Sequence, residues 1–231
     1  MNNEILDRPV RSGAEPHVAL ALVLDVSASM SESKGFKINE LNKAVNDLIS
    51  QVKQDSRLQN IVDLGIFVFG EKGKQPIHQG FRAMADCVDI SLVANDESTH
   101  VVSALEKAIE MVRTRCGIYD EGGGAYKPWI VLITDGEFHD SPSELNTIAR
   151  KMKDRETEGK LQFFGLGVKG YERSQLAQLT NKPSHVIDVD ARNFTEFLSW
   201  VGKSMAVIST TAIDATVELP DLELKTYRFS V

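Results

Sequence analysis

An unbroken run of seven apolar residues, Val18–Leu24, places the strongest constraint on how this chain can fold. A run of this length that is rich in Val and Leu and ends in polar residues is typical of a strand buried on both faces. Asp25, Ser27 and Ser29 follow it at alternate positions. In open α/β sheets, ligands bind at the carboxyl ends of such strands. The chain is therefore expected to deliver one carboxylate and two hydroxyls to a potential site.

The rest of the chain alternates between strand-like and helix-like patterns. Apolar runs recur at 61–69, 128–134, 161–168 and 185–189. Apolar residues at helical spacing fall between them, at 38–52, 101–112, 145–152, 172–179 and 194–205. Strands that alternate with helices pair in parallel. We therefore predict an α/β fold: a three-layer, doubly wound, mostly parallel sheet with helices on both faces.

Several local patterns refine this prediction. Residues 75–85 are expected to form an edge strand, because Pro76 is tolerated only at its start. Residues 116–126, which include three consecutive glycines, predict a loop. Arg113 and Arg115 are expected on the solvated face of the helix that precedes this loop.

The length of 231 residues predicts one large domain, which we place at 17–209. A polar N-terminal arm, 1–16, precedes it and a tail, 210–231, follows it. The tail is strand-like at Thr216–Leu219 and Leu224–Phe229. Two interpretations stay open: a short β-like segment packed on the domain, or a segment that pairs with a partner or a second copy.

Composition excludes some classes of function. A net charge of −7 argues against a general binder of nucleic acid or of anionic membranes. No signal peptide and no apolar run long enough for a membrane span are found in the sequence. Cys87 and Cys116 lack the spacing of metal ligands and are predicted to be free thiols in a reducing compartment. We therefore predict a soluble cytoplasmic protein.

Two further positions supply oxygen ligands. Thr99 stands at the start of the 101–112 helix, and Asp135 directly follows the apolar run that ends at Thr134. Each candidate also has a structural interpretation: an Asx or Ser turn for residues 25–29, a helix N-cap for Thr99, and a turn aspartate for Asp135. Their joint occurrence favours a site. Asp25, Ser27, Ser29, Thr99 and Asp135 are hard oxygen donors that could converge on one Mg²⁺ or Mn²⁺ ion.

The same segments resemble the von Willebrand factor A domain and its metal-ion-dependent adhesion site. They read DVSASM at 25–30, THVVSAL at 99–105 and LITDGE at 132–137. Within this Rossmann-like family the chain looks most like the bacterial tellurium-resistance, TerY-type branch. That likeness is carried by YKPW at 126–129, FFGLGV at 163–168 and FTEFLSWVGKSMAVIS at 194–209. Ala28 stands where the family usually has Gly, and Val102 where a Gly is common; neither change removes a ligand.

The resemblance implies a binding module and not an enzyme. Ser27, Ser29 and Thr99 would ligate the metal through hydroxyls, and Asp25 and Asp135 directly or through water. An open coordination position would accept an Asp or Glu carboxylate from a partner protein. In the tellurium-resistance branch that partner would be a phosphatase or a kinase, in a tellurite or chemical-stress response. The expected rim around the ion consists of Met30, His100, Glu137 and His139, with Asp140 beside them.

The alternative is a magnesium-dependent hydrolase or phosphotransferase with Asp25 as nucleophile. Such enzymes generally need a second acid two residues further on, and Ser27 occupies that position. The sequence also contains no nucleophile elbow, no phosphate-binding loop and no zinc-protease helix motif. These observations favour the binding module.

Overall fold

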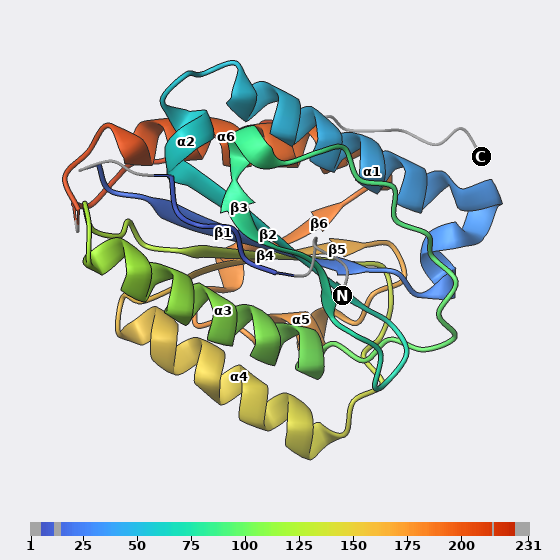
Figure 1. Cartoon of the computed structure of the whole chain (residues 1–231). Coiled ribbons are helices and arrows are strands. Elements are labelled where there is room, and N and C mark those ends of the chain that lie inside the picture. The colour runs from blue at the N-terminus through green and yellow to red at the C-terminus, as the bar shows by residue number, and fades with distance from the viewer. Residues whose placement is uncertain (1–5, 12–14, 214, 225–231) are drawn as a thin grey trace.

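A six-stranded sheet forms the centre of the computed structural model, which describes residues 6–11, 15–213 and 215–224 (Figure 1). Its order is β3-β2-β1-β4-β5-β6. The strands are β1 (Val18–Asp25), β2 (Val62–Phe69), β3 (Ile77–Ala83), β4 (Trp129–Thr134), β5 (Gln162–Val168) and β6 (Val186–Val189). All neighbouring strands run parallel except β2 and β3, which are antiparallel. The predicted mostly parallel sheet, with the segment after Pro76 at its edge, is confirmed.

Helices cover both faces of the sheet, as predicted. One layer contains α1 (Glu32–Lys53), α2 (Leu58–Ile61) and α6 (Phe194–Ser209) (Figure 1). The opposite layer contains α3 (Val102–Asp120), α4 (Pro142–Thr157) and α5 (Arg173–Ala177). Short 3-10 turns connect these elements at η1 (Ala28–Ser31), η2 (Met84–Asp86), η3 (Pro183–His185) and η4 (Ala191–Asn193). None of the helices in the described ranges combines the length and hydrophobicity needed to cross a bilayer.

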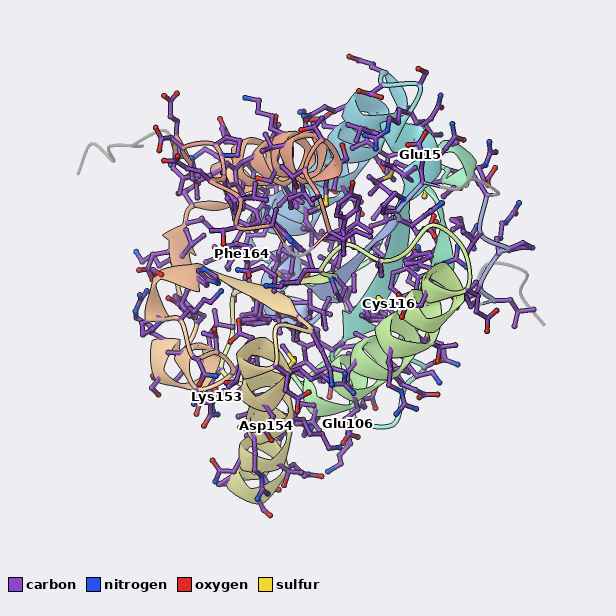
Figure 2. The ribbon with its side chains drawn as sticks, turned by 90° about the vertical axis from the view of Figure 1, so that its left-hand side faces the viewer. Glu15, Glu106, Cys116, Lys153, Asp154 and Phe164 are labelled. Carbon is purple, nitrogen blue, oxygen red and sulfur yellow. The ribbon has the colours of Figure 1, made fainter. Side chains whose placement is uncertain are left out.

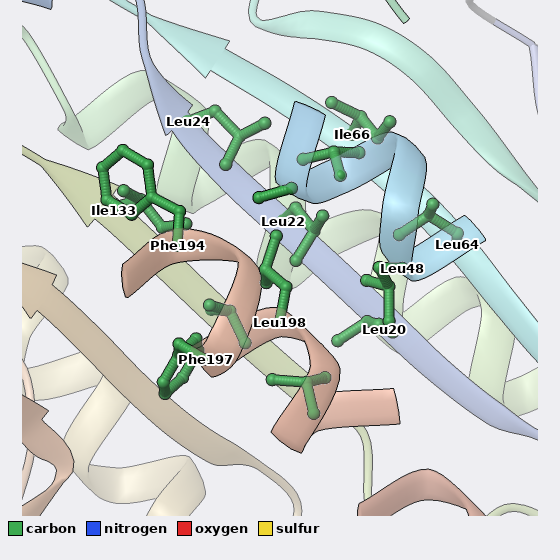
Figure 3. Close-up of a cluster of buried hydrophobic side chains, with 14 of the residues drawn as sticks. Leu20, Leu22, Leu24, Leu48, Leu64, Ile66, Ile133, Phe194, Phe197 and Leu198 are labelled. Atoms are coloured by element: carbon green, nitrogen blue, oxygen red, sulfur yellow. The ribbon is translucent and has the colours of Figure 1, made fainter. Parts of the chain in front are cut away.

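Strand β1 is completely buried because both of its faces meet helices. Leu20, Leu22 and Leu24 point toward α1 and α6, where they join the side chains of Phe194 and Leu198 (Figure 3). The intervening Ala19, Ala21 and Val23 belong to the cluster on the side of α3 and α4. This alternation explains why the run contains no polar residue: neither face of the strand reaches water.

An aromatic cluster fills the space between the sheet and α6. Phe164 of β5 lies there (Figure 2), with its ring centroid 5.1 Å from that of Trp200 and 4.8 Å from that of Trp129. Phe197 completes the cluster, 6.4 Å from Phe164. All four aromatic residues lie within the three segments that resemble the tellurium-resistance branch. In this structure these segments therefore contribute to the packing of the core.

The strand order places the predicted ligands at one edge of the sheet. The chain leaves β1 toward β2 and β3 on one side and returns to β4 on the other. Leu24 pairs with Ile133, so the carboxyl ends of β1 and β4 lie side by side. Ligands of open α/β sheets bind at the point where the direction of winding reverses. Asp25 and Asp135 both lie at this point.

Two asparagines of α1 hold the extended segment that leads toward Thr99. The Asn42 amide donates to the Leu92 carbonyl at 2.9 Å and accepts from the Leu92 N–H at 2.8 Å. One turn further along α1, Asn46 makes the same pair of bonds with Ile90, at 3.0 and 2.8 Å. The segment therefore has strand-like bonding without a partner strand.

Replacing Asn42 with alanine is expected to lower the free energy of unfolding by about 1 to 3 kcal/mol, because both backbone groups of the buried Leu92 lose their partner. Urea unfolding followed by circular dichroism measures this. Asn39→Ala, at an exposed position of the same helix, is the control and should change stability by less than about 0.5 kcal/mol. Equal effects at the two positions would contradict the proposed anchoring.

The structure corrects two predictions near the end of α3. The helix continues to Asp120, so the loop begins five residues later than predicted, at residue 121 instead of 116. Tyr119 explains the extension: it is buried and its hydroxyl donates to Asp63 Oδ2 at 2.6 Å. Arg113 is exposed as expected. Arg115 is not on the solvated face but buried, where its guanidinium contacts the same carboxylate.

The C-terminal tail also differs from its prediction. Residues 215–224 form no strand, and the remaining part of Leu224–Phe229 lies outside the described residues. Instead the tail follows α6, where Trp200 Nε1 donates to the Pro220 carbonyl at 2.7 Å. Its apolar side chains pack against the core, namely Val217, Leu219, Leu222 and Leu224. Burial of these side chains against a helix replaces strand pairing.

Candidate metal centre

Asp25, the last residue of β1, is completely buried and held by neutral donors. Its Oδ1 accepts from the Ser27 N–H at 2.8 Å, and its Oδ2 accepts from the Thr134 hydroxyl at 2.6 Å. Burial raises the pKa of Asp25 to about 6, although these hydrogen bonds act in the opposite direction. A bound cation would favour the ionised carboxylate. The carboxylate is therefore costly in the metal-free protein and suited to a site that receives a cation.

A chain of hydroxyls connects this end of β1 to the end of β4. The Ser27 and Ser29 Oγ atoms lie 3.0 Å apart, and the Ser29 hydroxyl donates to Asp135 Oδ1 at 2.6 Å. Ser29 and Asp135 are 106 residues apart in the sequence. The parallel pairing of β1 with β4 brings them together, and Asp135 is buried like Asp25.

The Thr99 side chain lies at the same place. A β-carbon built on Gly136 would be 3.5 Å from Thr99 Oγ1 and 3.9 Å from Ser29 Oγ. Both hydroxyls thus face the backbone immediately after Asp135. Thr99 does not cap a helix, which was the structural interpretation of its position, because α3 begins only at Val102. The N–H of Val101, which precedes the helix, donates instead to Asp140 Oδ2 at 2.7 Å.

Residues 139 and 140 hold the Thr99 segment in place. The His139 N–H donates to the Thr99 carbonyl at 2.9 Å, and the Thr99 N–H donates to His139 Nδ1 at 3.2 Å. Asp140 is buried, and its second oxygen lies 3.6 Å from His100 Nδ1. Asp140 therefore positions the start of α3. The sequence predicted that it would lie at the exposed rim, and this prediction is wrong because the side chain is buried.

The other rim predictions have mixed outcomes. Glu137 and His139 are exposed, and His100 is half-buried. Met30 is completely buried, so the prediction that it contacts a partner is wrong. Its side chain points into the core beneath the start of α1, where it joins the cluster that contains Leu24. Polar neighbours on both sides in the sequence concealed this role.

Lys37 is a site residue that the sequence analysis missed. Its Nζ lies 2.5 Å from Asp135 Oδ2. Lys37 lies one position before the buried Ile38, at the border of the apolar face of α1. That border position was the available signal, but it does not indicate which distant residue the ammonium group reaches.

The donor set fits a hard divalent cation. It consists of three hydroxyls and two carboxylates, all with oxygen donors, which Mg²⁺ and Mn²⁺ prefer. In the described part of the chain, no group of three or more His, Cys, Asp or Glu side chains is arranged to hold a metal. The oxygen atoms that converge at this edge thus include the hydroxyls of Ser27, Ser29 and Thr99 beside the two carboxylates.

Comparison with known proteins gives a family match and several similar structures. A family model described as the von Willebrand factor type A domain matches residues 19–200. No curated protein sequence matches the chain.

Among the solved structures, the pilus adhesin SpaC from Lactobacillus rhamnosus GG has a TM-score of 0.66 at 16% identity, covering 87% of this chain and 32% of that one. A von Willebrand factor type A protein from Catenulispora acidiphila has a TM-score of 0.58 at 16% identity, with 83% and 43% covered. Proximal thread matrix protein 1 from the mussel byssus, with a zinc-occupied MIDAS motif, has a TM-score of 0.55 at 16% identity, with 83% and 48% covered. The chain thus spans less than half of each of these proteins, and the likeness concerns the fold.

Proposed function

The chain belongs to the von Willebrand factor type A domain family, and on this basis we propose that it is a metal-dependent protein–protein interaction module. The observation that carries the proposal is the convergence of Asp25, Ser27, Ser29 and Asp135 through hydrogen bonds at the switch point of the sheet, with the Thr99 hydroxyl beside them. Three separate segments supply these groups, which a set of unrelated turns and caps does not explain.

In the proposed site, the neutral and the charged side chains have different roles. Ser27, Ser29 and Thr99 would hold Mg²⁺ or Mn²⁺ through neutral hydroxyls, and Asp25 and Asp135 would supply negative charge directly or through water. The bound ion supplies an electrophilic position for a carboxylate oxygen of the partner. The chain's own contribution to specificity would come from the exposed Glu137 and His139, which flank the site.

The geometry gives no support to catalysis by Asp25. Both of its oxygens accept hydrogen bonds, and the side chain is completely buried, so the carboxylate is not presented to a substrate. Ser27, two residues on, cannot act as a general acid or base at neutral pH. Recognition needs neither a nucleophile nor a general base.

A narrower assignment, to the bacterial tellurium-resistance branch, is supported by sequence resemblance alone. It would make the partner a phosphatase or a kinase of a tellurite or chemical-stress response. The segments that carry the resemblance contribute Trp129, Phe164 and Trp200 to the core. Identification of the proteins that co-purify with the chain from a tellurite-exposed bacterial host would test it.

Titration calorimetry tests the metal site. The wild-type protein is expected to bind one Mg²⁺ or Mn²⁺ ion, and Asp25→Ala combined with Asp135→Ala should lower the affinity at least about 100-fold. Asp47→Ala combined with Asp188→Ala removes the same charge from two exposed positions and should leave the affinity unchanged. An unaffected double variant at the site would contradict the ligand assignment.

A second measurement separates the module from the enzyme. Capture of a partner protein should be lost both with chelator and with the Asp25→Ala, Asp135→Ala variant. Metal-dependent turnover of a generic phosphoester by the wild type, abolished in that variant, would overturn the module and support the hydrolase.

A further inference from the structure

Lys37 reaches the candidate metal centre from the start of α1. Its Nζ lies 2.5 Å from Asp135 Oδ2 and 3.4 Å from the Ser29 carbonyl oxygen. Only 19% of the lysine side chain is exposed. Lys34 (φ 64°) and Gly35 (φ 78°), in the first turn of α1 just before this residue, have left-handed backbone conformations. The ammonium group thus contacts two of the residues that belong to the site.

Asp135 has its charge balanced by this contact. The side chain is fully inaccessible to solvent, and its two oxygens accept from the Ser29 hydroxyl and from Lys37. A buried carboxylate without a nearby cation is strongly unfavourable. Lys37 is the basic residue with a direct ion pair to Asp135 in the described part of the chain. It therefore performs in the metal-free protein the electrostatic role that a divalent ion would perform in the loaded one.

We propose that Lys37 is a built-in competitor of the metal ion: it neutralises Asp135 when metal is absent and lowers the affinity of the site for metal. The inference rests on the proposed metal site. An ammonium group and a divalent cation that share one carboxylate repel each other, so metal binding is opposed by Lys37 and weakens its contact with Asp135. Glu32 offers the released ammonium an alternative partner, since its Oε2 already lies 3.9 Å from Nζ.

The competition gives the site a defined response to metal concentration. Without Lys37 the buried Asp135 charge would be compensated only by metal, and the empty site would be poorly tolerated. With Lys37 the empty site is stable, and the module becomes competent for its partner only when the metal concentration is high enough to displace the ammonium. Lys37 thus sets the threshold at which the module engages.

Calorimetry on Lys37 variants measures this effect. Lys37→Met replaces the side chain with an unbranched apolar one that is a single atom shorter and uncharged, and is expected to bind Mg²⁺ about tenfold more tightly than the wild type. Lys37→Gln is a second neutral variant and should show the same gain. Lys37→Arg retains a cation and should stay close to the wild type. Lys43→Met removes the same charge from an exposed position of α1 and should leave the affinity unchanged.

Two further readouts do not depend on affinity. In chelator, Lys37→Met should have a lower Tm than the wild type, because Asp135 loses its counter-ion, and saturating Mg²⁺ should remove this difference. Labelling of the wild type with an amine-reactive reagent, quantified by peptide mass spectrometry, should modify Lys37 several-fold more with Mg²⁺ than with chelator. Lys43 serves as the internal reference.

The outcomes separate this inference from the proposed function. Weaker metal binding by both neutral variants would overturn the competition and show that Lys37 instead orients Asp135 for the metal. Metal binding by the wild type with no gain in the variants, and unchanged Lys37 labelling, would overturn the inference while leaving the metal site intact. Absence of metal binding in every variant, including the wild type, would overturn both, whatever the effect of Lys37→Met on the Tm in chelator.

Discussion

Replacing Asp63 with alanine is expected to lower the free energy of unfolding by about 3 to 5 kcal/mol, because it leaves a buried guanidinium without a counter-ion. Asp63 of β2 and Arg115 of α3 are both inaccessible to solvent. Arg115 Nε lies 2.8 Å and Nη2 lies 2.6 Å from Asp63 Oδ2, which also accepts from the Tyr119 hydroxyl.

Urea unfolding of four proteins measures the pair: the wild type, Asp63→Ala, Arg115→Met and the double variant. Each single variant leaves the remaining member of the pair buried without its partner. The double variant removes both charges and should recover much of the lost stability. Asp188→Ala breaks an exposed ion pair with Arg173 and should cost less than about 1 kcal/mol. Additive single effects would show that the buried pair is not coupled.

The location of this pair explains why it supports the fold and not the site. Asp63 pairs with Ala19 near the beginning of β1, whereas Asp25 ends that strand. The chain therefore has a buried aspartate at each end of its central strands. Arginine compensates the first. Neutral donors surround Asp25, and its ionised carboxylate is stabilised further only when a cation binds from solution.

The layer order was predictable from the sequence because each strand carries its own burial pattern. A strand such as Val18–Leu24, apolar at every position, has to be covered on both faces, and helical segments between the strands supply the cover. The same argument predicted that residues 25 and 135 lie near each other, since both follow central parallel strands. Both the layer order and the proximity of residues 25 and 135 follow from strand burial and strand direction, and neither depends on a contact between particular side chains.

Contacts made by long charged side chains were not predictable in the same way. Arg115 and Lys37 each lie on a helix beside apolar residues, where a solvated position and a buried ion pair leave the same local pattern. Their partners are 52 and 98 residues away in the sequence. The prediction that Met30 lies at the rim was wrong for a related reason. Its neighbours Ser29 and Ser31 are polar, and no residue pattern marks the 3-10 turn that directs its side chain inward.

Replacing Asp25 with asparagine is expected to separate stability from metal binding. The substitution keeps the shape of the side chain: its oxygen can accept from the Ser27 N–H, and its amide can donate to the Thr134 hydroxyl. Because burial raises the pKa of Asp25 from 3.8 to about 6, the metal-free wild type carries an unfavourable charge at neutral pH. The variant should therefore be more stable than the metal-free wild type at pH 8, by up to about 3 kcal/mol.

The pH dependence has a definite sign. Between pH 4 and 6 the folded wild type holds the Asp25 proton more tightly than the unfolded chain does, so its free energy of unfolding falls as the pH rises through this window. Asp25→Asn should lack this component of the fall, and the exposed Asp188→Asn should retain it. Chemical denaturation in chelator at several pH values provides the measurement.

Metal binding should respond to the same substitution in the opposite direction. The Mg²⁺ affinity of Asp25→Asn is expected to fall about 10- to 100-fold, since the site loses one of its two negative charges, and Mg²⁺ should no longer raise the Tm as it does in the wild type. A turn aspartate that only caps the next segment would give a different result: the Mg²⁺ affinity and the rise in Tm with Mg²⁺ would be the same in the variant and in the wild type. The two roles of Asp25 that the sequence left open therefore predict different responses to Mg²⁺: the substitution abolishes the rise in Tm if Asp25 serves the metal site and leaves it unchanged if Asp25 is only a cap.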